Sequence, residues 1–328
     1  MPINRHFGRL AAAVFAVFAA GLACDAQAQS YPTRIVRLVV AFPAGGPTDF
    51  VARLLADKLK TIFGQTVLVE NKPGANGVLG GDYVAKSEPD GHTLWLTTAG
   101  AVVITPGMRA DMPYQTLRDF APVTQVVRNT TILVVRPDHP AADAKAFVAM
   151  AKAKPAAIPF ASTGVGSMQH LALELLQASA GVKFLHVPYR GAAPAMTDLL
   201  GGTVQAVFLD AGALAGHIQG GRMRPLGAAS DYRTEVLPTV PTLLEQGFAG
   251  THAENWYGLL APARTPPAVV AKIHDAFTTA LNDGEVRRKL LESGAVPAPS
   301  SPDELGKLMQ SELTRWSRVV KEHAIKEE

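Results

Sequence analysis

Two glycine-rich segments contain the residue types that could bind an anion. Residues 41–49 (Ala-Phe-Pro-Ala-Gly-Gly-Pro-Thr-Asp) follow an apolar run, and residues 161–167 (Ala-Ser-Thr-Gly-Val-Gly-Ser) stand between a short apolar run and a helix-like pattern. A glycine-rich turn between a strand and a helix lets backbone N–H groups converge on an anion at the positive end of the helix. Because one such loop lies in each half of the chain, the sequence predicts a ligand held from two sides.

The same residues could also have simple structural roles. Gly45 and Gly46 could serve only a tight turn. Asp49 could be only a favourable partner of a helix dipole, and Ser167 and Asp210 could be only helix caps. Neither loop contains Lys or Arg. An anion held there would therefore be bound by N–H groups, hydroxyls and ordered water.

Catalytic and metal-binding patterns are not favoured. His170 and His186 lack the spacing of a metal site, so a structural role is expected for both. The sequence has no Gly-x-Ser-x-Gly motif, and residues 164–167 do not form a nucleophile elbow. Residues 45–47 (Gly-Gly-Pro) do not supply a dinucleotide-binding fingerprint. We expect no enzyme activity, no catalytic residue, no metal and no cofactor, with an exported hydrolase as the least favoured alternative.

The first 28 residues have the features of a secretory signal peptide. Arg5 and Arg9 give a positive start, residues 10–22 form an uncharged apolar core, and residues 26–28 (Ala-Gln-Ala) fit the rule for cleavage. The apolar core is shorter than the roughly 20 residues that a membrane anchor needs. The sequence predicts cleavage after Ala28 and a location in the periplasm.

Cys24 is the only cysteine, and it leaves one alternative open. A cysteine soon after an apolar core can be the lipid-modified first residue of a lipoprotein. Gly21 argues against this, because such signals usually have a larger apolar residue at its position. Cleavage after Ala28 would remove the cysteine, and with it any disulfide or thiolate chemistry. The formal net charge is +3 and no Lys/Arg run is present, so we expect no nucleic-acid partner and no anionic membrane surface.

The rest of the chain alternates between strand-like and helix-like patterns, which predicts an α/β fold with parallel strands. Residues 100–127 read as a less regular stretch. The expected strands are 34–42, 66–70, 93–97, 132–136, a strand near Phe160, 184–187, 204–209, 225–230 and 256–261. The expected helices are 49–63, 77–85, 142–152, a helix from Ser167, 194–200, 213–219, 267–281, 285–293 and 302–322.

The C-terminal part has too few strands to form a third domain, so we expect it to complete the first. The predicted division is domain 1 at 29–130 and 254–328, and an inserted domain 2 at 131–253. Two crossings between two α/β domains make a hinge, and a hinge makes a cleft that can close on a ligand.

A series of short motifs in the mature chain resembles the Bug family, the periplasmic solute-binding receptors of tripartite tricarboxylate transporters. The resemblance covers essentially all of the mature chain. It is carried by residues 31–34, 39–49, 69–74, 89–93, 119–123, 161–167 with His170 and Leu171, 186–191, 198–201, 237–242 and 256–259. It implies the two-lobed periplasmic binding protein fold, type II-like (Venus flytrap), in which each lobe is a mostly parallel sheet flanked by helices.

The resemblance also implies the site and the function. The receptors bind a carboxylate in the interdomain cleft and deliver the solute to membrane subunits, here as an expected monomer. The solute would be a di- or tricarboxylate, an acidic amino acid or an aromatic carboxylate. The alternative is a carboxylate-sensing receptor that docks on a signalling protein. The implied ligand-binding residues are Phe42, Ala44, Gly45, Gly46, Asp49, Thr98, Ser162, Thr163, Gly164, Gly166, Ser167 and Asp210.

Some positions depart from the family pattern and bear on which ligand is bound. Thr105-Pro106 replaces the usual Asn-Pro, and His92 stands where Tyr is common. Asn129 lies at the expected domain crossing, where the family varies, and could contribute an amide contact to the ligand.

Overall fold

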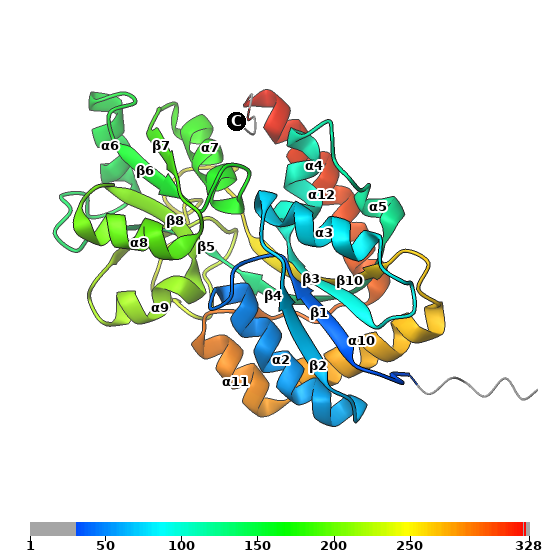
Figure 1. The fold of residues 1–328 in the computed structure, drawn as a ribbon. Coiled ribbons are helices and arrows are strands. Elements are labelled where there is room, and N and C mark those ends of the chain that lie inside the picture. Colours follow the sequence, from blue (N-terminus) through cyan, green and yellow to red (C-terminus); the bar gives the residue numbers. More distant parts are fainter. Residues whose placement is uncertain (1–30, 324, 326–328) are drawn as a thin grey trace, which may run out of the picture.

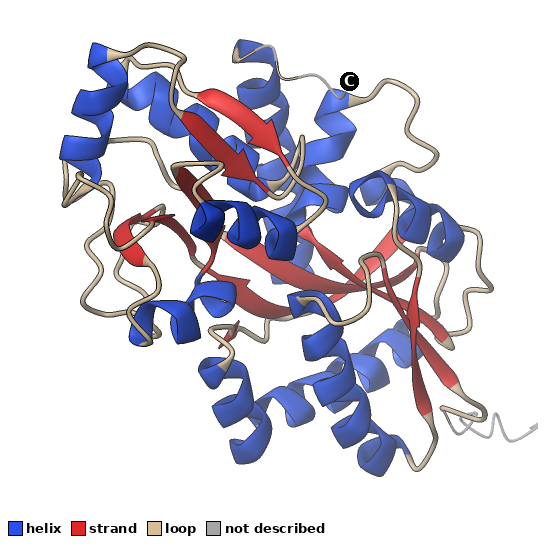
Figure 2. Ribbon diagram, turned by 60° about the vertical axis from the view of Figure 1, so that its left-hand side comes forward, coloured by secondary structure: helices blue, strands red, loops and turns tan. Residues whose placement is uncertain are grey.

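The protein is described by a computed structural model that covers residues 31–323 and Ile325. The predicted signal peptide and Cys24 lie outside these described residues. Figure 1 shows two groups of elements, each built on one sheet. We call the part with the first sheet the first lobe and the part with the second sheet the second lobe. Figure 2 shows helices on both sides of the strands.

The first sheet has the strand order β11-β4-β10-β3-β1-β2. Strands β10 and β11 run opposite to the other four. The strands are β1 (Val36–Val40), β2 (Val67–Asn71), β3 (Thr93–Thr98), β4 (Phe120–Asn129), β10 (Asn255–Pro262) and β11 (Val296–Pro297). The sheet therefore combines an N-terminal and a C-terminal part of the chain.

The second sheet has the order β7-β6-β8-β5-β9, and only β5 runs opposite to its neighbours. The strands are β5 (Thr131–Val135), β6 (Pro159–Ser162), β7 (Leu185–Pro188), β8 (Ala206–Asp210) and β9 (Arg224–Ala228). The chain crosses from β4 to β5 through Thr130 alone and returns between β9 and β10. We propose the domain boundaries given above at these two crossings.

Helices cover both sheets. In the first lobe they are α2 (Pro47–Phe63), η1 (Ala75–Gly77), α3 (Val78–Ala85), the π-helix η2 (Gly100–Ile104), α4 (Thr105–Met108), α5 (Thr116–Asp119), α10 (Pro267–Asn282), α11 (Gly284–Glu292) and α12 (Pro302–Glu322). In the second lobe they are α6 (Ala144–Ala153), α7 (Met168–Ala180), α8 (Ala192–Gly201) and α9 (Ala211–Gln219).

Local sequence explains where the site-forming helices begin and end. Helix α2 starts with Pro47 at its first position, where the missing N–H is no loss, and ends at Gly64 in the left-handed region. The Ser167 side chain caps α7 by accepting from the His170 N–H, and Gly181 ends that helix in the left-handed region. Both helices therefore start at fixed positions directly after a strand and a glycine-rich loop.

Alternating side chains of the strands fill apolar layers on both faces of each sheet. In the first sheet, Leu38 and Leu96 pack under α2 and α10, while Trp95 lies on the opposite face. In the second sheet, Phe160 and Phe208 pack on one face. These layers fix the carboxyl ends of β1, β3, β6 and β8, from which the candidate site is built.

Candidate ligand-binding site

The first loop joins β1 to α2, and a buried carboxylate holds its shape. The Asp49 side chain accepts from the Gly45 N–H (2.9 Å), from Asn71 Nδ2 (2.9 Å) and from the Arg53 guanidinium (2.8 and 3.0 Å). Asn71 also donates to the Phe42 carbonyl at 3.0 Å. Burial alone would raise the pKa of Asp49, but these hydrogen bonds from Arg53, Gly45 and Asn71 hold it below its usual range. Asp49 therefore fixes the conformation of the first loop through these hydrogen bonds.

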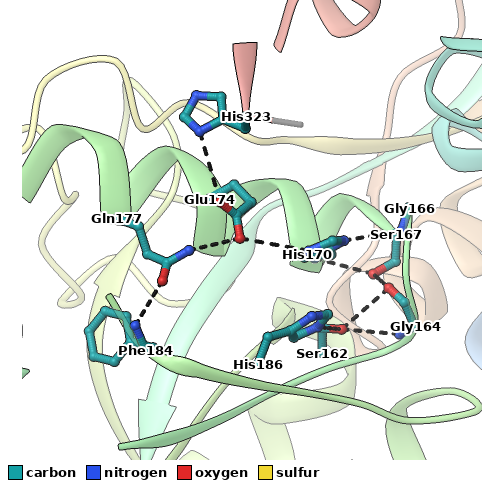
Figure 3. A network of polar contacts seen from close by, with 10 residues as sticks. All are labelled: Ser162, Gly164, Gly166, Ser167, His170, Glu174, Gln177, Phe184, His186 and His323. Carbon is teal, nitrogen blue, oxygen red and sulfur yellow. Dashed lines mark hydrogen bonds and ion pairs between the residues drawn. The ribbon is translucent and has the colours of Figure 1, made fainter. Parts of the chain in front are cut away.

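The second loop joins β6 to α7 and is held by its own hydroxyls (Figure 3). Ser167 Oγ donates to the Gly164 carbonyl at 2.7 Å, and the Gly164 N–H donates to Ser162 Oγ at 3.2 Å. Gly164 and Gly166 have φ values of 133° and 75°, a region that only glycine adopts without strain. The two glycines therefore allow this tight turn, and the serines fix it.

Two stacked histidines support the second loop from behind. The rings of His170 and His186 lie parallel with centroids 4.1 Å apart. His170 Nδ1 accepts from the Gly166 N–H at 3.2 Å, and His186 Nε2 lies 2.7 Å from Ser162 Oγ. Burial lowers the pKa of His170 to about 3 and that of His186 to about 4, so both rings are neutral at physiological pH. The histidines hold the loop as neutral hydrogen-bonding groups.

A chain of hydrogen bonds connects the second loop to the start of α2. Thr163 Oγ1 donates to Gln169 Oε1 (2.7 Å), and Gln169 Nε2 donates to Asp210 Oδ1 (2.6 Å). Across the lobe boundary, Asn255 Nδ2 donates to Asp210 Oδ2 at 3.0 Å. The Tyr257 hydroxyl donates to the Asp210 carboxylate as well.

Thr48 completes this chain, because its hydroxyl hydrogen-bonds to Tyr257 at the first turn of α2. Burial raises the pKa of Asp210 to about 6, although the hydrogen bonds from Asn255, Gln169 and Tyr257 act in the opposite direction. The carboxylate of Asp210 thus lies between the two helix starts, in an environment that disfavours its charge.

A second contact joins the lobes at the other end of the second loop. Asn76 Nδ2 donates to Thr105 Oγ1 (3.1 Å) and to the Gly166 carbonyl (3.2 Å). A Cβ at Gly166 would lie 2.7 Å from Met108 Sδ, so no larger residue fits there without a shift. The second loop therefore touches the first lobe directly.

The structure brings most of the expected site residues to one place. Thr98 ends β3 and pairs with Tyr257 in the sheet, next to Asp210. Ala44 and Gly45 lie exposed at the tip of the first loop, Phe42 is half-buried behind it, and Gly46 precedes α2. The sequence did not indicate Thr48, Gln169, Asn255, Tyr257 or Asn76. Of these, only Thr48 and Gln169 could have been found from the sequence, because each is a polar residue in the first helical turn after a glycine-rich loop.

Three of the loop amides already have acceptors in the protein. The Gly164 N–H donates to Ser162 within the second loop, and the N–H groups of Gly45 and Gly166 donate to Asp49 and His170 in the helices that follow. The amides of the first helical turn have no acceptor within a helix. The first helical bond of α2 runs from the Phe50 N–H to the Gly46 carbonyl, and that of α7 runs from the Leu171 N–H to the Ser167 carbonyl. The amides of residues 48–49 and 168–169 therefore have no acceptor within their helices.

Other features of the described chain lie apart from the loops. No helix in it has the length and apolar character needed to cross a bilayer. The described residues also include no group of three or more His, Cys, Asp or Glu that could hold a metal ion. A surface cavity of about 500 Å³ is lined by Lys152, Lys183 and His323, among others, and none of its lining residues belongs to either loop.

Comparison with known proteins identifies the family. The model of the tripartite tricarboxylate transporter family receptor matches residues 51–325. Protein BugT of Bordetella pertussis is 36% identical over 317 residues, which cover 96% of this chain and 97% of BugT.

Two solved structures with bound ligands share the fold. An R. palustris protein with adipate has a TM-score of 0.85 at 32% identity, covering 90% of this chain and 99% of that one. The MatC protein of Rhodopseudomonas palustris with bound malate has a TM-score of 0.81 at 33% identity, covering 88% and 100%. This chain therefore belongs to the TctC/Bug family of periplasmic solute-binding receptors.

Proposed function

We propose that this protein captures a small carboxylate-bearing solute between its lobes and delivers it to the membrane subunits of a tripartite tricarboxylate-type transporter, without catalysing a reaction. The observation that carries the proposal is the hydrogen-bonded chain from Thr163 to Thr48. It connects the first turns of α2 and α7 through Asp210 and Tyr257, which supports a site at which the N–H groups of both helix starts face one ligand carboxylate. Adipate and malate, bound by the two similar proteins, both carry carboxylates.

The carboxylate would be held without a basic side chain. The first-turn amides of the two helices supply donors, and the positive ends of the helix dipoles favour a negative charge. The hydroxyls of Thr48, Ser162, Thr163 and Ser167 and ordered waters would complete the coordination. Asp49, Ser167 and the stacked histidines fix the two loops, which reduces the ordering that binding requires.

A thermal-shift screen of the mature protein against carboxylates tests the proposal. A ligand that binds only the native state stabilises it by RT ln(1 + [L]/Kd), about 2.7 kcal/mol at a hundredfold excess over Kd. We expect at least one di- or tricarboxylate, acidic amino acid or aromatic carboxylate to raise the melting temperature, and uncharged amides of the same acids to leave it unchanged. Equal shifts by acids and amides would contradict a carboxylate site.

We also propose that the protein reaches the periplasm after cleavage behind Ala28 and acts as a monomer. Mass spectrometry of the periplasmic fraction should show a chain that begins at Gln29. A cytoplasmic chain of full length, or one that begins at acylated Cys24, would refute cleavage at this site.

A further inference from the structure

We propose that Glu174 and His323 form a pH-dependent contact that holds the two lobes together. The contact is attractive when the His323 ring is protonated and the Glu174 carboxylate is ionised, so it favours the closed arrangement of the lobes in a mildly acidic medium. The pair lies outside both binding loops and acts with or without a ligand, so its effect is independent of the proposed function.

The two residues belong to different lobes. Glu174 lies on α7 of the second lobe, and His323 directly follows α12 of the first lobe. His323 Nδ1 is 3.8 Å from Glu174 Oε2, as Figure 3 shows. In Figure 1 the end of α12 lies beside α7, away from the crossing between β4 and β5. A rotation of the lobes about the two crossings would therefore separate this pair.

Local structure holds both side chains in place. The Ile325 N–H donates to the Val320 carbonyl at 3.0 Å and Ile325 is buried, which anchors the chain around His323. Gln177 Nε2 donates to Glu174 Oε1 at 2.7 Å, and the other oxygen, Oε2, faces His323. The Glu174 and His323 side chains are 13% and 19% exposed, so water screens their interaction less than that of a fully exposed pair.

Charged and titratable groups surround the pair. They are His170 on α7, Lys183 after α7, Lys152 on α6, and Lys321 and Glu322 on α12. His170 Nε2 lies 3.8 Å from Glu174 Oε1, and its ring is neutral at physiological pH. Lys152 and Lys183 line the same surface cavity as His323 and oppose a charge on its ring. The Glu174 carboxylate and the carbonyl end of α12 favour that charge.

The two protonations act in opposite directions. A histidine ordinarily takes up its proton near pH 6.5, so the ion pair is absent at pH 8 and forms as the pH falls. Burial raises the pKa of Glu174, although Lys183, His323 and Gln177 act in the opposite direction. Once Glu174 also takes up a proton, the attraction is lost again. The contact therefore contributes most at a pH between the two protonations.

Single-molecule FRET on the ligand-free protein tests this contact. Dyes on Lys145→Cys and Gln310→Cys would label exposed positions of the second and the first lobe, and a chain that begins at Gln29 has no other cysteine. We expect the ratio of closed to open molecules to rise roughly two- to fivefold between pH 8 and pH 6, the effect of a partly exposed ion pair. The ratio should fall again towards about pH 4.5, where carboxylates take up protons. Glu174→Gln and His323→Gln should each abolish the rise.

His274→Gln is the matched control, because His274 Nδ1 lies 3.2 Å from the Asp275 carboxylate within α10 of the first lobe. It should keep the wild-type rise. Asp210 titrates in the same range, since its pKa is about 6, and His323→Gln leaves it in place. A rise that persists in His323→Gln, or a wild-type ratio that does not change with pH, would overturn the inference. If Glu174→Gln fails to fold, His323→Gln alone decides. Because no ligand is present, failure of every carboxylate to bind would overturn the proposed function and leave this result intact.

Discussion

Gly45 and Gly46 are neighbours with different backbone requirements. Gly45 has a φ of 80°, in the left-handed region, whereas Gly46 has φ −81° and ψ 171°, which any residue adopts. A Cβ at Gly46 would lie 3.4 Å from the Pro43 carbonyl oxygen, close to an ordinary contact. The glycine pair in the sequence indicated a tight turn, but not which of the two glycines makes it.

Gly45→Ala should therefore destabilise the protein more than Gly46→Ala. A non-glycine residue in the left-handed region costs roughly 1–2 kcal/mol. We expect about that loss in the free energy of unfolding for Gly45→Ala, and a much smaller change for Gly46→Ala. Urea unfolding measures both. Equal losses would show that the turn does not depend on the φ of Gly45.

His170 should make the protein sensitive to acid. Its folded pKa of about 3 is below the ordinary value of 6.5, so the unfolded chain binds the proton more readily. The stability that the neutral ring contributes is present above pH 6.5 and is lost as the pH falls towards 3. His170→Gln keeps an acceptor for the Gly166 N–H and should flatten this loss. Unfolding measured from pH 7 to pH 3.5, with His274→Gln as control, tests this, and an unchanged slope would exclude His170 as a cause.

We expect the start of helix α7 to depend on Ser167 both for its stability and for ligand binding. Ser167→Ala removes the cap on the His170 N–H and the bond to the Gly164 carbonyl. We expect a loss of about 0.5–2 kcal/mol in stability and weaker carboxylate binding. Arg190→Ala, at an exposed position after β7, should change neither. Calorimetry on folded variants decides: if Arg190→Ala alone abolishes binding, a side-chain cation holds the carboxylate.

Most elements could be predicted from the sequence because their apolar periodicity is strong. Helix α12, for example, was expected at 302–322 and spans Pro302–Glu322. Strand β4 (Phe120–Asn129) was missed within the stretch 100–127. Its buried positions do not alternate, since it contains Pro122 and pairs with β10 through two register shifts. The alternation of apolar and polar residues that usually indicates a strand is therefore absent from β4.

Strand direction and the site network could not be predicted in this way. Strand β10 runs opposite to β3, although both have similar apolar sequences, because direction depends on the whole chain path. Asn255 and Tyr257 contact Asp210 from 45 and 47 positions away along the chain, so neither could be recognised without the fold. The loops were predictable because their residues are consecutive.

At the scale of the whole molecule, ligand should shift an equilibrium between open and closed arrangements of the lobes. The lobes touch through Asn76 and Gly166 and through Asp210 and Asn255. We expect small-angle scattering to give a smaller radius of gyration with a saturating ligand than without it. Superimposable curves with a ligand shown to bind would argue for lobes that are already closed in its absence.

One contact between the lobes is made by backbone alone. A Cβ on Gly212 would lie 2.0 Å from the Ser293 carbonyl oxygen, and a Cβ on Gly294 would lie 2.2 Å from Gly212 Cα. The methyl group added by Gly212→Ala should therefore push the two lobes apart and lower the population of the arrangement that binds the ligand. The apparent affinity is proportional to that population, so it should fall by the same factor for every ligand. Titration with several carboxylates should show one common factor, so this position would tune the working range of a biosensor without altering its selectivity.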